Sequence, residues 1–151
     1  IKKGDCLLFD FGATINGYHS DITRTFFIES VSDENRNIYQ AVLKANELGK
    51  KISKPKLTLH ELDDAVLNSL CDSGYEDLIV HKTGHGLGMD VHEDPYVMRN
   101  NTEILLSGMV ITIEPGLYKQ GKLGVRIEDD VLITDTGCDS LTTFSRELTI
   151  I

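Results

Sequence analysis

Residues 6–28 read CLLFDFGATINGYHSDITRTFFI, a segment in which two apolar, β-rich runs lie on either side of an Asn-Gly pair. Asn-Gly is the pair most typical of a two-residue hairpin turn, because both residues tolerate the positive φ angles that such a turn requires. The runs Cys6–Phe11 and Asp21–Ile28 are therefore predicted to be strands of a β-hairpin that turns at Asn16-Gly17.

Two amphipathic helices are predicted to follow this hairpin. A serine N-cap and two acidic residues open the first helix, and apolar residues recur at helical spacing, so it should cover residues 33–53. Pro55 separates it from a second helix, which should begin at a capping box made by Thr58 and Glu61. Gly74 is the predicted end of that helix.

The rest of the chain is predicted to be mainly strands. A Gly-rich loop is expected at residues 84–88, and strands at residues 109–114 and 124–134 are expected to be joined by a turn around Gln120-Gly121. Strands followed by helices and then by more strands indicate an α+β fold, with the helices on one face of an antiparallel sheet. No repeat or linker divides the chain.

Length, charge and cysteine content exclude several classes of protein. The 151 residues suit a single domain, and the net charge of −9 has the wrong sign for binding duplex DNA or an anionic membrane. No apolar run is long enough to span a bilayer. The cysteines, Cys6, Cys71 and Cys138, are too widely spaced to suggest a disulfide framework or a thiolate zinc site. We therefore expect a cytoplasmic protein with no nucleic-acid or membrane partner.

Three acidic residues, Asp10, Glu114 and Glu128, interrupt strand-like apolar runs. Burying an unpaired carboxylate is costly, so each must reach solvent, a cationic side chain or a metal ion. Taken singly, Asp10 and Glu114 could end strands at the surface. Glu128 could pair with Arg126, which is two residues away and therefore on the same face of a strand.

Asp21 and His85 extend this set of candidate ligands. The predicted hairpin could bring Asp21 close to Asp10, although an aspartate beside a turn is usually a cap. His85 lies between two glycines, which leave room for an imidazole, although a lone histidine in such a loop is usually structural. Four acids and one histidine together would suit Mn²⁺, Co²⁺, Fe²⁺ or Zn²⁺, and two such ions would neutralise the four carboxylates. The residues alone thus suggest a dinuclear site, and their spacing does not establish that they converge.

Five motifs, in this order, resemble those of the pita-bread metallopeptidases, the family of methionine aminopeptidase, Xaa-Pro aminopeptidase and prolidase. They are LFDFG at 8–12, YHSDITRTF at 18–26, HKTGHGLG at 81–88 leading to VHEDP at 91–95, TIEPG at 112–116, and VRIEDD at 125–130. The motifs extend through nearly the whole chain and contain all five candidate ligands. The resemblance implies the pita-bread fold.

The same resemblance implies two divalent metal ions, with Mn²⁺ or Co²⁺ expected ahead of Zn²⁺ or Fe²⁺. Asp10 would bind one ion, His85 and Glu114 would bind the other, and Asp21 and Glu128 would bridge both. Two ions would lower the pKa of a shared water molecule and polarise the scissile carbonyl group.

Four residues receive catalytic roles from the resemblance. Glu114 would be the proton shuttle, and His92 would donate to the substrate and stabilise the tetrahedral intermediate. Arg126 would orient a bridging acid, a role that suits a planar guanidinium, and His81 would lie on the substrate side. Without the resemblance, His92 would be read as a surface histidine and Arg126 as an ion-pair partner. Three further polar residues are predicted to be structural or solvated: His19, His60 and Asp129.

The motifs DITRTF and RIEDD look more like those of Xaa-Pro enzymes than those of methionine aminopeptidases. The predicted activity is therefore that of a metal-dependent exopeptidase, an Xaa-Pro aminopeptidase or Xaa-Pro dipeptidase, which acts on peptides with proline in the second position. Two alternatives are a creatinase-like amidinohydrolase, which has this fold without metals, and a non-catalytic peptide-binding module. The presence of all five ligands argues against both alternatives.

The extent of the chain carries a further expectation. Asp10 lies close to the first residue, Ile1, whereas the family has further helices and strands before its first metal ligand. We therefore expect residues 1–151 to be the C-terminal catalytic part of a longer enzyme, truncated on its N-terminal side, and to bind metal better than they cleave peptide. A homodimer is also expected from the resemblance.

Overall fold

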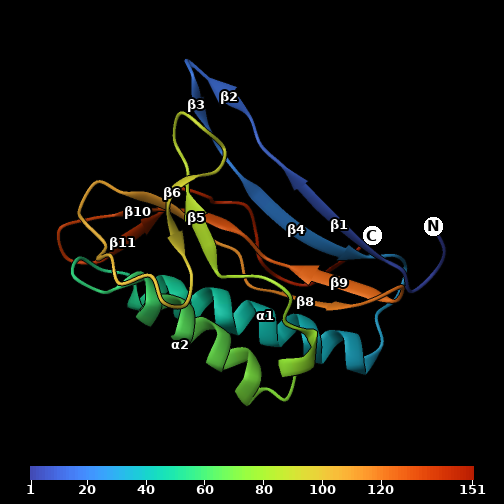
Figure 1. Cartoon of the computed structure of the whole chain (residues 1–151). Coiled ribbons are helices and arrows are strands. Elements are labelled where there is room, and N and C mark those ends of the chain that lie inside the picture. The colour runs from blue at the N-terminus through green and yellow to red at the C-terminus, as the bar shows by residue number, and fades with distance from the viewer.

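A computed structural model describes all residues from 1 to 151. In chain order the elements are β1 (Cys6–Phe11), β2 (Thr14–Ile15), β3 (Tyr18–His19), β4 (Ile22–Phe27), α1 (Asp33–Ile52), α2 (Leu59–Asp72), the short 3₁₀ helix η1 (Glu76–Leu78), β5 (Gly84–Gly86), β6 (Glu93–Val97), β7 (Val110–Ile113), β8 (Gly116–Lys119), β9 (Leu123–Arg126), β10 (Asp129–Ile133), β11 (Cys138–Ser140) and β12 (Thr149–Ile150). The two helices lie together on one side of the strands (Figure 1). The predicted α+β arrangement is confirmed.

The N-terminal hairpin forms as predicted. β1 pairs with β4 in antiparallel register over its whole length, from Cys6 opposite Phe27 onwards. The tip is a small extra hairpin, β2 with β3, which turns at Asn16 and Gly17 with φ angles of 53° and 85°. These positive values are those that Asn and Gly tolerate best, so the local sequence and the turn agree.

Both helices begin with the predicted caps. Ser32 accepts a hydrogen bond from the Asn35 backbone N–H at the start of α1. At the start of α2, Thr58 Oγ1 accepts from the Glu61 N–H at 3.1 Å and Glu61 Oε2 accepts from the Thr58 N–H at 2.8 Å, which completes the capping box. Gly74 follows the end of α2 with a φ of +83°.

The predicted Gly-rich loop at residues 84–88 is wrong in part, because Gly84–Gly86 form strand β5. This strand lies inside an antiparallel sheet with the order β11-β10-β7-β5-β6. A Cβ atom on Gly84 would lie 2.0 Å from the backbone oxygen of Thr112, so only glycine permits this approach of β5 to β7. Glycines carry no apolar pattern, so no strand signal is present in the sequence here.

The predicted strand at residues 124–134 is two strands, β9 and β10. β9 pairs with β8, whereas β10 pairs with β7, and the chain changes partner at Ile127 and Glu128. The backbone N–H of Glu128 donates to the oxygen of Thr23 in β4 at 3.1 Å. The predicted turn at Gln120-Gly121 joins β8 to β9 and does not lead from β7. Val131 and Ile133 continue the alternation of Val125 and Ile127, and Asp129 alone interrupts it, so the pattern does not divide the segment into two strands.

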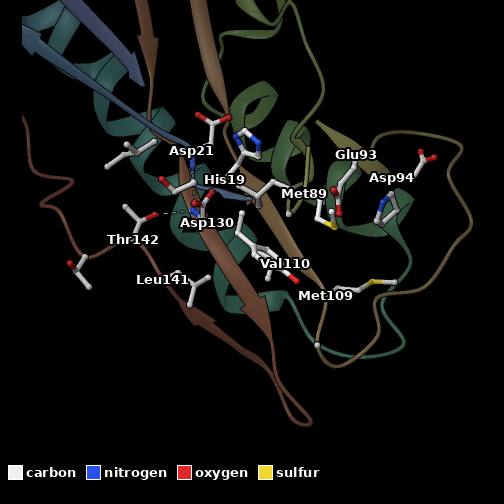
Figure 2. Close-up of a pocket in the computed structure, with 18 of the residues that line it drawn as sticks. His19, Asp21, Met89, Glu93, Asp94, Met109, Val110, Asp130, Leu141 and Thr142 are labelled. Atoms are coloured by element: carbon white, nitrogen blue, oxygen red, sulfur yellow. Dashed lines mark hydrogen bonds between the residues drawn. The ribbon is translucent and has the colours of Figure 1, made fainter. Parts of the chain in front are cut away.

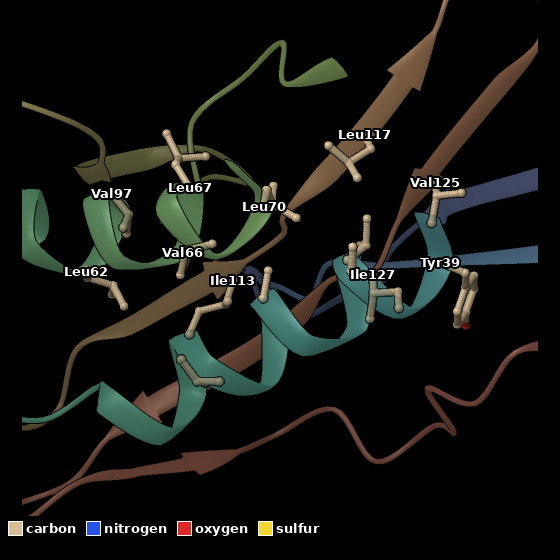
Figure 3. Close-up of a cluster of buried hydrophobic side chains, with 14 of the residues drawn as sticks. Tyr39, Leu62, Val66, Leu67, Leu70, Val97, Ile113, Leu117, Val125 and Ile127 are labelled. Carbon is tan, nitrogen blue, oxygen red and sulfur yellow. The ribbon is translucent and has the colours of Figure 1, made fainter. Parts of the chain in front are cut away.

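The hydrophobic core lies between the two helices and the strands (Figure 3). Val66 of α2, Ile113 of β7 and Ile127 are completely buried, and each contributes roughly 1.5–3 kcal/mol by burial. The Asn46 side chain of α1 donates to the backbone oxygen of Ile113 at 2.9 Å. The end of β7, where Glu114 follows, is thus held to α1 by both packing and a hydrogen bond.

The last features of the fold are the directions of the paired strands and the character of the two helices. β12 pairs with β4 in parallel, whereas the other strand pairs are antiparallel. Neither α1 nor α2 combines the length and the apolar character that a bilayer-spanning helix needs.

Candidate metal centre

One polar cavity of about 280 Å³ brings together the residues to which the sequence analysis gave a role. Its lining residues are Asp10, Asp21, His81, Lys82, His85, His92, Glu114, Arg126 and Glu128. Every predicted metal ligand and catalytic residue is among them, and Lys82 is the one addition. The ligands come from β1, the start of β4, β5, the end of β7 and the junction of β9 with β10. Their convergence is therefore a product of sheet topology.

The ligand atoms form three overlapping groups, and within each group they all lie within 4.8 Å of one another. One group contains Asp10, Asp21 and Glu128; the second contains His85, Glu114 and Glu128; the third contains Asp21, His85 and His92. Asp21, His85 and Glu128 each belong to two groups, whereas Asp10, His92 and Glu114 belong to one. Each group could hold a metal ion.

His85 presents one ring nitrogen to the other ligands. Its Nδ1 lies 3.0 Å from the backbone oxygen of Gly86, and a hydrogen bond there places the proton on Nδ1 and leaves Nε2 as an acceptor. Nε2 lies 3.3 Å from Glu114 Oε1 and 3.9 Å from Asp21 Oδ2. Burial lowers the pKa of His85, so the imidazole favours the neutral form that binds metals.

Cationic side chains compensate the buried carboxylates only in part. Burial, together with the charge of Glu114, raises the pKa of Glu128 to about 9. Burial raises the pKa of Glu114 to about 7, although the charges of Arg126 and Lys82 act in the opposite direction. Burial and the charge of Asp10 also raise the pKa of Asp21. Divalent cations would offset the negative charge of these buried carboxylates, so the donor set fits the metal ions that the sequence implied.

Arg126 does more than pair with its neighbour in sequence. Its Nη2 forms an ion pair and a hydrogen bond with Asp10 Oδ2. Its Nε lies 3.9 Å from Glu128 Oε2 and 4.0 Å from Glu114 Oε2. The guanidinium therefore faces three of the four carboxylates, a contact that a simple Arg126–Glu128 surface pair would not make.

Tyr118 connects Arg126 to His81. Arg126 Nη1 donates to the Tyr118 hydroxyl at 3.2 Å, and His81 Nε2 lies 2.9 Å from the same oxygen. His81 Nδ1 lies 2.8 Å from the backbone oxygen of Lys82. Tyr118 is in β8, a strand that the sequence analysis did not predict, and no sequence signal pointed to it.

Two threonines that were not predicted also support the ligands. Thr23 Oγ1 donates to Glu128 Oε2 at 2.5 Å and accepts from Arg126 Nε at 3.0 Å. Thr112 Oγ1 accepts from the backbone N–H of His85 at 3.1 Å and lies 3.4 Å from Glu114 Oε1. Each threonine is two residues from a ligand, and strand alternation could have placed both on the ligand face.

His92 is exposed but lies against the cluster. Its ring centroid is 4.1 Å from that of His85, and the two ring planes meet at 66°. The residue is therefore at the cavity mouth, where a substrate would pass.

Asp129 lies on the opposite side of β10 from the cavity and is fully buried. Its carboxylate pairs with Arg24 and Lys50, each at 2.7 Å, and with Arg146 at 2.5 Å. Glu128, the neighbouring motif residue, thus faces the other candidate ligands. Asp129 instead links β4, α1 and the C-terminal segment through its ion pairs.

A second cavity of about 900 Å³ lies beside the start of β4 and is lined in part by residues 141–144 (Figure 2). It is larger than the polar cavity but mostly apolar, and none of the three ligand groups lies within it. Asp21 borders both cavities, and its backbone N–H donates to Asp130 Oδ2 at 3.0 Å. The ligand chemistry therefore belongs to the smaller cavity.

A helix-backed, mainly antiparallel fold that gathers four carboxylates and an imidazole in one cavity defines a pita-bread metallopeptidase. The chain belongs to metallopeptidase family M24, which matches residues 1–135. The predicted family and fold are confirmed.

Similar proteins place the chain in the prolidase branch of this family. It is 44% identical to an Xaa-Pro dipeptidase of Pyrococcus furiosus over 148 residues, which are 98% of this chain and 42% of the relative. The prolidase of Thermococcus sibiricus has a TM-score of 0.97 and 44% identity, over 100% of this chain and 41% of that one. The X-Pro aminopeptidase of Thermotoga maritima MSB8 has a TM-score of 0.96 and 39% identity, and the match covers 100% of this chain and 42% of that one. The chain thus spans about two fifths of these relatives.

Proposed function

We propose that this protein is a metal-dependent exopeptidase that hydrolyses the bond between an N-terminal residue and a following proline. The observation that carries the proposal is the convergence of all five predicted ligands, with His92, Arg126 and His81, on one cavity. The names of the similar proteins support the choice of Xaa-Pro substrates. They include both dipeptidases and aminopeptidases, so they leave the length of the peptide open.

Asp10, Asp21, His85, Glu114 and Glu128 would hold two divalent ions, for which we propose Mn²⁺ or Co²⁺, with Zn²⁺ or Fe²⁺ as alternatives. Oxygen-rich donors with a single imidazole, and carboxylates whose pKa values are raised in the absence of cations, support this assignment. When bound, the ions would supply a water molecule of lowered pKa and a Lewis acid for the scissile carbonyl.

The side chains around this centre have separate roles in the proposal. Glu114 would take a proton from the attacking water and deliver one to the leaving amine, because its carboxylate lies among the candidate ligands in the cavity. His92, at the cavity mouth, would donate to the oxyanion of the tetrahedral intermediate. Arg126 would hold Asp10 and Glu128 in position, and His81 would contact the substrate beside Tyr118.

We also propose that residues 1–151 are the C-terminal catalytic part of a longer enzyme that acts in the cytoplasm and forms a homodimer. The three cysteines are unpaired, which supports a reducing compartment. Phe9 and Phe11 of the edge strand β1 are exposed, which supports association through that side. The mass in solution tests the dimer.

Metal analysis followed by an assay with Ala-Pro and Ala-Pro-Ala tests the proposed activity. We expect bound metal, release of alanine, loss of activity with a chelator and recovery with Mn²⁺ or Co²⁺. Peptide binding without turnover would instead support a non-catalytic module. Turnover of creatine without metal would support a creatinase-like enzyme.

A further inference from the structure

Arg24 of β4 is a buried arginine whose guanidinium group has all of its donors occupied. The residue is only 2% exposed. A guanidinium group has five N–H donors, and Arg24 has five acceptors at 2.6–2.9 Å. These acceptors are the backbone oxygens of Thr23, Glu128, Phe144 and Ser145 and the carboxylate oxygen Oδ1 of Asp129. Most of the bonds that Arg24 makes are therefore to main-chain carbonyl groups.

Charge compensation alone does not account for an arginine at this position. Asp129 also pairs with Lys50 at 2.7 Å and with Arg146 at 2.5 Å, so its carboxylate has two cationic partners without Arg24. Neither Lys50 nor Arg146 forms a hydrogen bond with Glu128. What Arg24 adds is a set of bonds to the backbone, and such a set needs a planar group that carries several donors.

The backbone of Glu128 depends on β4 for its hydrogen bonds. Glu128 lies in the junction where the chain has left β8 and has not yet paired with β7. Its N–H donates to the Thr23 oxygen, and its own oxygen accepts from Arg24 Nη1 at 2.6 Å and from no backbone N–H. The same Nη1 donates to the Thr23 oxygen at 2.8 Å, and the Thr23 hydroxyl donates to Glu128 Oε2. Arg24 therefore binds both the backbone of Glu128 and the residue that holds the Glu128 side chain.

We infer that Arg24 is a positioning residue for the candidate metal centre, which holds the carboxylate of Glu128 where it can bridge two metal ions. The inference rests on the proposed metallopeptidase function and adds to it a residue that does not line the cavity. Without the guanidinium group, the buried Glu128 oxygen would lack a donor, so the junction would shift and carry the carboxylate with it. Replacing residues that orient metal ligands typically changes metal affinity or activity by about 10–100-fold.

The test compares Arg24→Lys with Lys50→Met in Mn²⁺ titrations followed by calorimetry and by electron paramagnetic resonance. Arg24→Lys keeps the charge but has three donors in place of five. We expect it to weaken Mn²⁺ binding about tenfold or more, to reduce the magnetic coupling between the two ions, and to lower kcat for Ala-Pro with little change in KM. Lys50→Met is the matched control, because it removes one ion pair of Asp129 and leaves the bonds of Arg24 intact. Its melting temperature should fall while its metal affinity and magnetic coupling stay unchanged.

Metal binding separates this inference from the proposed activity, because it needs no turnover. If the unaltered chain cleaves Ala-Pro but the two variants bind Mn²⁺ alike, the activity stands and the inference is wrong. If the unaltered chain binds Mn²⁺ but cleaves nothing, the proposed activity fails, and a loss of affinity confined to Arg24→Lys still supports the inference. A chain that binds no Mn²⁺ contradicts both.

A failure of Arg24→Lys to fold also has a defined outcome. Arg24→Gln, which keeps an amide donor, then takes its place in the same measurements. If neither variant folds while Lys50→Met does, Arg24 serves stability alone and the inference is wrong.

Discussion

Glu114 shows how single side chains set the chemistry of the cavity. Its Oε1 lies 3.3 Å from His85 Nε2, and its Oε2 lies 4.0 Å from Arg126 Nε. Burial raises its pKa to about 7 against the opposing charge of Arg126. The residue therefore has both the position of a ligand and the proton affinity of a general base, and its two roles can be separated only by substitution.

Replacing Glu114 by glutamine should reduce Xaa-Pro hydrolysis by at least about 10²-fold, because the amide has neither the ligand charge nor the proton-shuttle function. The measurement is kcat under saturating Mn²⁺, with metal content determined in parallel. His60→Ala is the control, since His60 accepts from the Asn100 N–H outside the cavity. Comparable activity in the two variants would contradict the assignment of Glu114.

Arg126→Lys keeps the charge but loses the planar fork that reaches Asp10, Thr23 and Tyr118 together. We expect kcat to fall about tenfold or more while the melting temperature changes little, because the side chain is only partly buried and lies outside the hydrophobic core. An unchanged kcat would mean that Arg126 acts only as an ion-pair partner.

At the scale of elements, the close approach of β5 to β7 positions the cluster. β5 carries His85, β7 leads into Glu114, and Thr112 of β7 contacts both. The backbone N–H of Glu114 also donates to the oxygen of Thr83 at 2.8 Å. Asp63 of α2 in turn accepts from the Thr83 N–H at 2.8 Å. The helix layer thus fixes the spacing of two strands through buried polar contacts.

Gly84→Ala should destabilise the protein by about 1–3 kcal/mol and weaken metal binding, because the added Cβ would overlap the Thr112 backbone oxygen at 2.0 Å. Urea unfolding and Mn²⁺ titration measure the two effects. Gly137→Ala is the matched control, because its Cβ would meet no atom within 4 Å. Equal stability of the two variants would show that β5 can move away from β7 without loss.

In the molecule as a whole, two buried carboxylates with raised pKa values link stability to pH. Glu114 and Glu128 have an ordinary pKa of 4.5, and in the folded, metal-free protein these values rise to about 7 and about 9. Over this range the folded state binds more protons than the unfolded chain, so the free energy of unfolding must fall as pH rises. Their contribution is fully present below pH 4.5 and is lost by about pH 9.

We therefore expect the melting temperature of the metal-free protein to decrease from pH 5 to pH 9, and Mn²⁺ to reverse most of that decrease by taking the place of the protons. Thermal unfolding followed by circular dichroism, with and without Mn²⁺, measures the effect. The control is Glu128→Gln, which should flatten the pH dependence without metal. A metal-free protein that is most stable at pH 9 would show that the carboxylates are compensated in some other way.

Features with local causes follow from the amino-acid sequence alone. The Asn16-Gly17 turn, the capping box at Thr58 and the stop at Gly74 depend on residues that are neighbours in the chain, and each forms as predicted. The motifs also identified the family and predicted the five candidate ligands that the polar cavity brings together. The resemblance could do so because ligand chemistry depends on residue type.

Features that arise between distant segments depend on the folded arrangement of the chain. Gly84–Gly86 form a strand because β6 and β7 pair with the segment and Gly84 permits the close approach to β7. The chain changes partner at Glu128, whose backbone N–H donates to Thr23 of β4. Tyr118 bonds to Arg126, and Lys82 Nζ lies over the Tyr96 ring, and no spacing along the chain encodes either contact. The physical reason is that hydrogen bonds and burial depend on which segments are close in space. Sequence patterns indicate only which face of a single helix or strand is apolar.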